Sequence, residues 1–335
     1  MTGAAANTSP GLWTLAWRRL RADRVAMMAL AVVAAFLLLL VLSSSGMVAA
    51  DWERETGVNY APPSFVGADA AGAAVAAAPT SLPANAFDPL ADDIAALGKL
   101  GVAAAPAPKR PTLPFGADKW GHDIVKKTVK GGQTSIVVGL GAALLAVILG
   151  TLFGALAGFY GGIVDDLFNW FYSVFTAIPS ILMILTVAAV LQQKGVTTIV
   201  LILGLTGWTG PFRLIRAEYI KHKGREYVLA AHAIGASHWR QMFGHIFPNV
   251  SHVALVQLSI LVVGFIKAEV ILSFLGFGVP VGTVSWGSML NEAQNELILG
   301  KWWQLVAAAS AMALLVTAFS LLTDALRDAL DPTLT

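Results

Sequence analysis

The chain contains no cysteine and few charged residues, and each shortage excludes a class of protein. Without cysteine it has no disulfide framework, no thiolate nucleophile and no cysteine-ligated metal. Charged residues make up 13% of its 335 positions, whereas a soluble domain has about 25%. Much of the usual solvated surface is therefore missing. The net charge of +2 gives no reason to expect nucleic acid as a partner.

A phosphate-binding loop is also missing. The Gly-Lys pairs at 98–99 and 300–301 are followed by Leu100 and Trp302, where such a loop requires Ser or Thr. We therefore expect this chain to hydrolyse no nucleotide, to bind no cofactor of its own and not to be an enzyme.

Long apolar runs take the place of these features, and hydrophobic residues account for 56% of the sequence. A helix needs about 20 such residues to cross roughly 30 Å of hydrocarbon. The runs that reach or approach this length are residues 25–42, 134–160, 167–191, 196–215, 250–275 and 302–323. We predict an all-α integral membrane protein with six transmembrane helices. Pro179 and Gly210-Pro211 predict kinks in the third and fourth spans.

The positions of Lys and Arg predict that both termini are cytoplasmic. Four arginines precede the first run, and an even number of spans places the basic loop 216–249 on the same side. The basic residues that support this orientation are Arg18, Arg19, Arg21, Arg24, Arg216, Lys221, Lys223, Arg225 and Arg240. Three lysines at 126, 127 and 130 oppose it, although the rule weakens for long loops. The first run is also longer than the about 7–15 residues of a signal peptide, which favours an uncleaved helix.

The predicted organisation is an N-terminal segment 1–24, a first helix 25–46, an insertion 47–133, a core 134–325 and a tail 326–335. The insertion is rich in Ala, Pro, Gly and Asp, a composition that predicts no packed core. One interpretation is an extended, partly mobile periplasmic loop. The other is a cap over the pore mouth or a contact for a substrate-delivery protein. In the second span, Gly150, Gly154 and Gly158 predict close helix packing.

The loop between the fourth and fifth spans has the most informative spacing in the chain: Ala230-Ala231, then Gly235, then Pro248. Glycine reaches left-handed backbone angles at little cost and suits a helix end, and proline stops a helical segment. We therefore predict two short helices joined at an angle at Gly235, the second ending at Pro248. The alanine pair would keep the first helix thin enough for a partner's groove. The alternative is a basic loop held near anionic lipid.

Polar residues near this loop and inside the spans suggest further sites. Most histidines lie in or beside the loop, but without the spacing of a metal site, so we predict no metal. Glu269 and Lys267 fall within the fifth span, where an ionised group costs about 2.5–3.5 kcal/mol. Glu269 is either a pathway or intersubunit residue, or one of a snorkelling pair. We expect Trp286 and Trp302-Trp303 at the membrane–water interface, with a re-entrant gate at 276–301 as the alternative.

From about residue 113 to 332 the chain resembles the inner-membrane permease subunits of dipeptide, oligopeptide and nickel ABC importers. Within that family it resembles the subunit with the LSFLGxG…SWGxML signature. The strings that carry the resemblance are LSFLGFG at 272–278, SWGSML at 285–290, GFYGG at 158–162 followed by Asp165, Ile178-Pro179, Trp208 with Arg213 and Arg216, LRDALDP at 326–332, and WRRL at 17–20. Leu229 stands where the family normally has an acidic residue, and His232 and His122 stand where arginine is usual.

The resemblance implies a type I ABC-importer permease fold and a path shared with a homologous second permease. It further implies two cytoplasmic ATPases that bind ATP and Mg, a periplasmic substrate-binding protein, and membrane lipid around the spans. The implied ATPase-coupling residues are Arg225, Glu226, Ala230, Ala231, Gly235, Ala236 and Pro248. The candidate gate or pathway residues are Glu269, Ser273, Phe274, Trp286 and Met289.

Short peptides are the cargo that the resemblance implies first. Nickel, glutathione or antimicrobial peptides fit the same architecture. A stand-alone ion-coupled secondary transporter is the alternative of another class, and it would need several polar groups inside the spans.

Overall fold

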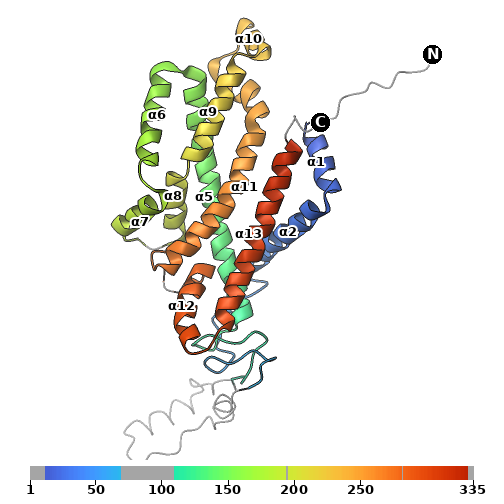
Figure 1. Cartoon of the computed structure of the whole chain (residues 1–335), viewed down its shortest axis with the longest axis vertical. Coiled ribbons are helices and arrows are strands. Elements are labelled where there is room, and N and C mark those ends of the chain that lie inside the picture. The colour runs from blue at the N-terminus through green and yellow to red at the C-terminus, as the bar shows by residue number, and fades with distance from the viewer. Residues whose placement is uncertain (1–11, 69–108, 194, 281, 331–335) are drawn as a thin grey trace, which may run out of the picture.

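The computed structural model describes residues 12–68, 109–193, 195–280 and 282–330, and helices dominate these parts of the chain (Figure 1). The order of elements is α1 (Leu12–Ala22), α2 (Arg24–Ser44), α5 (Ile124–Tyr160), α6 (Gly162–Thr176), α7 (Ser180–Leu191), α8 (Val196–Thr206), α9 (Thr209–Lys223), α10 (Glu226–Ala233), the π-helix η1 (Arg240–Ile246), α11 (Phe247–Phe274), α12 (Trp286–Ile298) and α13 (Trp303–Leu330). The predicted all-α class is confirmed.

Six spans fit the described residues when each bent helix pair counts as one span. α2, α5, α13 and the continuous stretch Arg240–Phe274 are each long and apolar enough to cross a membrane. α6 and α7 meet at an angle of 84°, and α8 and α9 at 41°. The first bend lies at Pro179, the N-cap of α7, as predicted. The second lies at Gly207 and Trp208, before the predicted Gly210-Pro211. Pro211 instead occupies the first turn of α9, where its missing N–H costs little.

Two predicted boundaries are wrong. α5 begins at Ile124, not at residue 134, because Asp123 caps it by accepting a hydrogen bond of 2.8 Å from the backbone N–H of Val125. The last part of the predicted insertion 47–133 is therefore the first part of a helix. α13 extends to Leu330 and takes in the start of the predicted tail 326–335. A helix satisfies its own backbone and can continue beyond the apolar layer, so hydropathy alone underestimates its length.

The glycine spacing in α5 makes room for α9. A Cβ atom added to Gly150 would lie 2.6 Å from the carbonyl oxygen of Trp208. A Cβ added to Gly154 would lie 2.8 Å from the carbonyl oxygen of Phe212, and one added to Gly158 would lie 2.7 Å from that of Arg216. Both carbonyls belong to α9. These distances leave no space for a side chain, so the predicted close helix packing is confirmed. The sequence does not identify α9 as the partner helix.

The described ends of the insertion, residues 47–68 and 109–123, form a small folded unit that we call the stem. Three isolated β-bridges connect these segments, among them Glu55 with His122 and Pro63 with Leu113, and a fourth lies within the second segment. Val58, Ala61, Leu113 and Ala117 form a buried cluster of their own. The prediction of no packed core is therefore wrong for the stem, because two separated segments supply a core that neither would form alone. The rest of the predicted loop, 69–108, lies outside the described residues.

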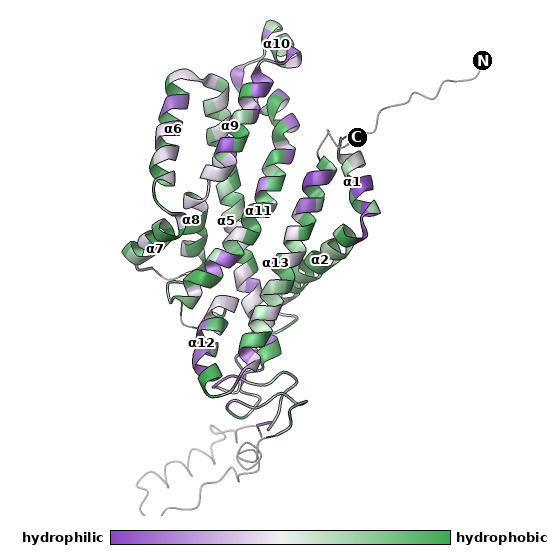
Figure 2. Cartoon of the chain, viewed as in Figure 1, coloured by the Kyte–Doolittle hydropathy of each residue, from purple (hydrophilic) through white to green (hydrophobic). Residues whose placement is uncertain are grey.

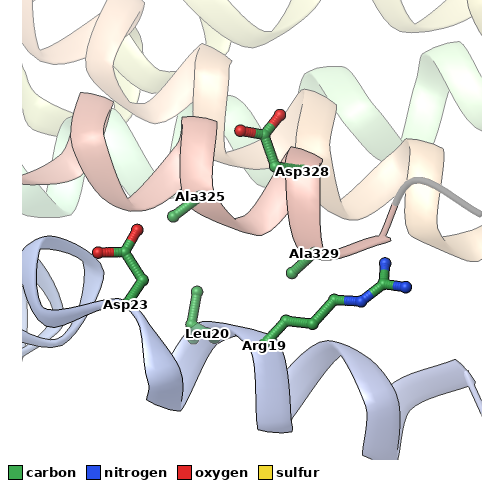
Figure 3. A pocket seen from close by; sticks show the side chains of 6 residues that line it. All are labelled: Arg19, Leu20, Asp23, Ala325, Asp328 and Ala329. Carbon is green, nitrogen blue, oxygen red and sulfur yellow. The ribbon is translucent and has the colours of Figure 1, made fainter. Parts of the chain in front are cut away.

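The two ends of the bundle differ in what they carry. α1, the end of α13 and α10 lie at one end, and the stem and α12 lie at the other (Figure 1). Hydrophobic residues line the helices between them (Figure 2). At the first end, Ala16 of α1 packs on Ala329 and Leu330 of α13. Figure 3 shows Leu20 directed toward the alanines of α13, with Arg19, Asp23 and Asp328 around this junction.

Candidate functional site

The candidate site is the elbow, which we define as α10, the turn 234–239 and η1. α10 ends at Ala233, Ile234 is its C-cap, and Gly235 follows with φ +84°. The turn is closed by backbone hydrogen bonds from Gly235 N–H to His232 O (2.9 Å) and from Ala236 N–H to Ala231 O (3.0 Å). The predicted helix end at Gly235 is confirmed, and its left-handed angle explains the residue type.

A second helical segment begins after Gly235, at residue 238, but its predicted end at Pro248 is wrong. η1 runs directly into α11, and Pro248 lies within the first turn of α11 without interrupting the chain of helical residues. The N–H of Phe247 bonds to the carbonyl of Met242, five residues earlier. This wider π turn allows the chain to pass a proline, which has no N–H to donate. The elbow is therefore one short helix hinged to the start of the fifth span.

The inner face of α10 is fixed to the bundle. Val228 is buried in a cluster with Tyr219 of α9 and Met242 of η1, and Ala231 is buried as well. Tyr219 Oη donates a hydrogen bond of 3.1 Å to the carbonyl of Met242. A displacement of α10 therefore acts on α9 and α11 together, because their side chains share one packed cluster.

The outer face of α10 and the turn leave large apolar side chains in the open. Ile234 is 85% exposed, Trp239 60% and Leu229 56%. Of the predicted coupling residues, Arg225, Glu226, Ala230, Gly235 and Pro248 are also exposed, Ala236 is half-buried and Ala231 is buried. Of the alanine pair, Ala231 therefore packs against the bundle and Ala230 lies on the surface. Large exposed apolar side chains within one short segment are typical of interaction sites.

The histidines in and beside the elbow form local contacts. His222 Nδ1 lies 2.8 Å from Tyr227 Oη, and His238 packs edge-on against Phe159 and Tyr160. Gln241 Nε2 lies 3.2 Å from His232 Nδ1 and donates to the carbonyl of Ala236. Within the ranges that the structure describes, no group of three His, Cys, Asp or Glu side chains is placed to hold a metal ion.

Four of the five gate or pathway candidates meet inside the bundle. Ser135 Oγ of α5 and Ser273 Oγ each donate to the Glu269 carboxylate, at 2.6 and 2.7 Å. The N–H of Trp286 donates to Ser135 Oγ at 3.3 Å. Met289 is buried in the same cluster of the core, whereas Phe274 is partly exposed.

These contacts correct the predictions for Glu269. Its side chain is fully buried within this chain, whereas Lys267 is exposed on the same helix. The two residues therefore form no snorkelling pair, and the carboxylate faces the interior of this chain and not another subunit. The hydrogen bonds from these two hydroxyl groups lower the free-energy cost of burying the Glu269 carboxylate.

The two signature strings LSFLGFG and SWGSML form one junction. A Cβ added to Gly287 would lie 2.6 Å from Ser273 Cβ, so α12 begins directly against α11. Ser285 caps α12 with a reciprocal hydrogen-bond pair to Ser288. Trp286 covers Gly132, and its indole Nε1–H donates to the carbonyl of Thr128 at 3.0 Å.

The expected interfacial position is wrong for Trp286 and Trp303. Both are buried, and the indole of Trp303 donates to the carbonyl of Ala117 at 2.7 Å. A buried indole needs such an acceptor. Trp302 is half-buried and packs near Phe65 and Phe115 of the stem. Composition alone does not distinguish a buried tryptophan from an interfacial one.

Buried charges join the stem to the bundle. Lys127 Nζ donates to Asp118 at 2.7 Å, to Glu292 of α12 at 2.6 Å and to Gln304 of α13 at 3.3 Å. Its neighbour Lys126 pairs with Asp51 at 2.7 Å. Two of the three lysines that oppose the predicted orientation are therefore paired with carboxylates.

Carboxyl groups in this junction have shifted pKa values. Burial alone would raise the pKa of Asp118, but His122 and Lys127 outweigh it and hold that pKa below its ordinary range. Burial raises the pKa of Glu296 to about 7, against the opposing pull of Lys127. Neither Glu296 carboxylate oxygen has a hydrogen-bond partner among the described residues. The junction therefore holds one carboxyl stabilised as an anion and one that favours its neutral form.

Sequence reasoning did not identify Tyr219, Met242 and the Asp165–Arg216 ion pair, which links α6 to α9. A signal for the pair was present, because both residues occur in strings that resemble the permease family. The two residues are 51 positions apart in sequence, so their pairing depends on how α6 packs against α9.

Comparison with known proteins agrees with this architecture. Residues 150–335 match the family described as binding-protein-dependent transport system inner membrane component, and residues 11–63 match the N-terminal TM domain of oligopeptide transport permease C. The dipeptide permease DppC of Bacillus subtilis is 36% identical over 66% of this chain and 68% of the relative. The oligopeptide permease OppC of the same organism is 37% identical over 66% and 72%. OppC of Haemophilus influenzae is 33% identical over 65% and 70%.

The family match covers more than half of the chain, and it includes both signature strings and the elbow. The chain belongs to the family of binding-protein-dependent transport system inner membrane components, the permease subunits of ABC importers.

Proposed function

We propose that this chain forms half of the path of an ATP-driven importer of short peptides, and that the elbow receives the work of cytoplasmic ATPases. One observation carries this proposal. α10 is fixed to α9 and η1 through Val228, while Leu229 of α10 and Ile234 and Trp239 of the segment that follows are exposed. A helix fixed on one side and apolar on the other suits docking into a groove of a partner protein.

The elbow can transmit movement because its attachments are rigid. Val228 packs in one cluster with Tyr219 and Met242, and α9 in turn lies in the glycine groove of α5. Packed elements of this kind shift as units and do not deform continuously. Movement of a docked ATPase would therefore reach α5, α9 and α11 together.

The proposed orientation places both termini and the elbow in the cytoplasm. The arginines of α1 and the basic residues near the elbow lie at one end of the bundle (Figure 1), and such charges favour the cytoplasmic side. The carboxylate partners of Lys126 and Lys127 weaken the argument for the opposite orientation. The stem and α12 would then face the periplasm, where a substrate-binding protein delivers cargo.

The complete transporter that we propose contains a homologous second permease and two ATPases that bind ATP and Mg. Short peptides are the favoured cargo because the relatives are named as dipeptide and oligopeptide permeases. Nickel, glutathione or antimicrobial peptides remain alternatives for the same architecture. Uptake of a labelled dipeptide by the reconstituted complex, compared with labelled glutathione and nickel, distinguishes these cargoes.

The elbow is tested with Gly235→Val in the complete complex. Gly235 has open space around it, so the substitution strains only its left-handed backbone, at φ +84°. We expect loss of ATP-driven uptake with normal insertion in the membrane. Gly224→Val is the matched control, because Gly224 is in the same loop and equally open but has φ −86°. Normal uptake by Gly235→Val would contradict the proposal.

The alternative of an ion-coupled secondary transporter makes an opposite prediction. Such a protein would take up cargo when this chain alone is reconstituted into liposomes with an ion gradient. We expect no uptake without the ATPases, and vigorous uptake would overturn the proposed function.

A further inference from the structure

α6 is the first half of the third span and is weakly embedded in this chain. None of its residues, all of which the structure describes, is buried. Its contacts with the rest of the bundle include aromatic ring pairs, such as Phe168 with Phe153 at 5.0 Å and Phe171 with Trp208 at 5.4 Å. Other ring pairs are tilted or edge-on, such as Phe175 with Trp208 at 5.4 Å. These apolar contacts are less directional than a charge-assisted pair, so they define the register of α6 less sharply than an ion pair would.

A single ion pair supplies that register. Arg216 of α9 donates from Nε to Asp165 Oδ1 at 2.5 Å and from its terminal nitrogen to Oδ2 at 2.6 Å. Asn169 Nδ2 also donates to Asp165 Oδ1, at 2.8 Å. Two parallel bonds between guanidinium and carboxylate have a defined geometry. Asp165 lies in the first turn of α6, where the helix dipole further favours a negative charge.

The arginine of this pair belongs to the rigid part of the elbow's attachment. A Cβ added to Gly158 would lie 2.7 Å from the carbonyl oxygen of Arg216, so this residue is wedged against α5. Tyr219, one turn later, bonds to the carbonyl of Met242 in η1. Arg216 therefore lies between the elbow and α6, on the helix that joins them.

We propose that Asp165 and Arg216 are positioning residues that make α6 move with α9 as one unit, so that movement of the elbow reaches the third span. This inference rests on the proposed function, because it names the connection through which the elbow acts. α7 turns away from α6 by 84° and packs on α8. The ion pair thus links the cytoplasmic half of the third span to the elbow.

The first test removes one charge in the complete reconstituted complex. Asp165→Asn should lower peptide uptake per ATP hydrolysed by about tenfold, as expected when a charge-assisted pair is lost, while ATP hydrolysis continues. Asp165→Glu should restore part of the coupling. Asp166→Asn is the matched control, because Asp166 is the exposed neighbour on the same helix, and it should behave as the unaltered chain. Unchanged coupling in Asp165→Asn would overturn the inference.

The second test uses the absence of native cysteine. In the double variant Asp165→Cys, Arg216→Cys the ion pair is lost, and we expect uncoupled ATP hydrolysis. A short bifunctional thiol reagent that joins the two positions should restore uptake, because α6 and α9 are again one unit. Persistent loss of uptake after complete cross-linking would show that the helices must separate, and the inference would be wrong. If Asp165→Asn fails to assemble with the ATPases, this variant decides the question.

Failure of this inference differs from failure of the proposed function. If only the ion pair is unimportant, Asp165→Asn transports normally while Gly235→Val remains defective. If the elbow receives no work from an ATPase, Gly235→Val itself transports normally.

Discussion

The two ends of this molecule differ in how they hold their buried polar groups, although both expose apolar side chains. At the stem end, a buried lysine meets its carboxylate partners within the same chain, and indole N–H groups find backbone acceptors. At the elbow end, Ile234, Leu229 and Trp239 remain exposed although they are apolar. The stem end is thus held by buried polar contacts within the chain, although Glu296 lacks a hydrogen-bond partner there and Ile298 of α12 is 83% exposed. The elbow has no comparable buried ion pair among the described residues, and its exposed groups are apolar.

We expect the buried contacts of the stem end to maintain the fold and the exposed side chains of the elbow to belong to the proposed docking surface. Loss of a partner at the stem end leaves a buried charge unpaired within the chain, which costs stability. Loss of an exposed apolar side chain at the elbow removes nothing from the core. The predictions below test whether the two ends can be distinguished by stability measurements alone.

The largest effect should follow Lys127→Met. Lys127 is 4% exposed, and its removal leaves Asp118 and Glu292 without their shared cation, a loss of roughly 3–5 kcal/mol for a buried pair. The measurement is the free energy of unfolding of the purified protein in detergent. Lys126→Met is the matched control, because its ion pair is solvent-exposed and contributes about 0–1 kcal/mol. Equal effects of the two variants would contradict the importance of burial.

The next effect is a pH dependence at Glu296. Burial raises its folded-state pKa to about 7 from an ordinary 4.5, so the folded protein holds a proton that the unfolded chain releases. Glu296 therefore contributes stability that is present below pH 4.5 and is lost as pH rises toward and through 7, by up to about 3 kcal/mol. Glu296→Gln should flatten the fall in unfolding free energy between these values. An unchanged slope in that variant would place the titration elsewhere.

A smaller effect should follow Gly154→Ala in α5. The new methyl would meet the carbonyl oxygen of Phe212 at 2.8 Å, and such overpacking costs about 1–3 kcal/mol. Gly264→Ala in α11 is the control, because nothing lies within 4 Å of its added Cβ. Alanine also favours a helix over glycine by about 1 kcal/mol. Thermal unfolding of the two variants should therefore shift in opposite directions.

The smallest change in stability, with a large change in function, should follow Ile234→Ser. At 85% exposure the side chain packs on little of this chain, so the unfolding free energy should stay within about 0.5 kcal/mol. Retention of the ATPases during purification of the complex should fall if Ile234 enters their groove. Stable retention together with normal uptake would remove Ile234 from the docking surface.

Much of the fold follows from local sequence features. Hydropathy predicts six spans because each helix must satisfy its backbone within the bilayer. The bend at Pro179 and the helix end at Gly235 follow from the restricted angles of proline and the wide range of glycine. These are properties of single residues and their immediate neighbours, so a sequence is sufficient to predict them.

Other features depend on which distant segments meet. Tryptophan is a residue type common at membrane interfaces, yet Trp286 and Trp303 are buried. Their indole N–H groups donate to backbone carbonyls of α5 and of the stem. Pro248 predicts a break, but the π turn of η1 accommodates it without one. The positions of Asp165 and Arg216 do not by themselves predict an ion pair between α6 and α9.

The sequence by itself determined the class of this protein, its apolar spans and the turn at Gly235, because short-range geometry and transfer from water govern them. Only the tertiary structure decided that Glu269 is enclosed by two serines, that Lys127 joins the stem to three helices and that α9 lies in a groove of glycines. Those outcomes arise from contacts between residues far apart in the chain, and the energies of such contacts exist only once the helices have packed.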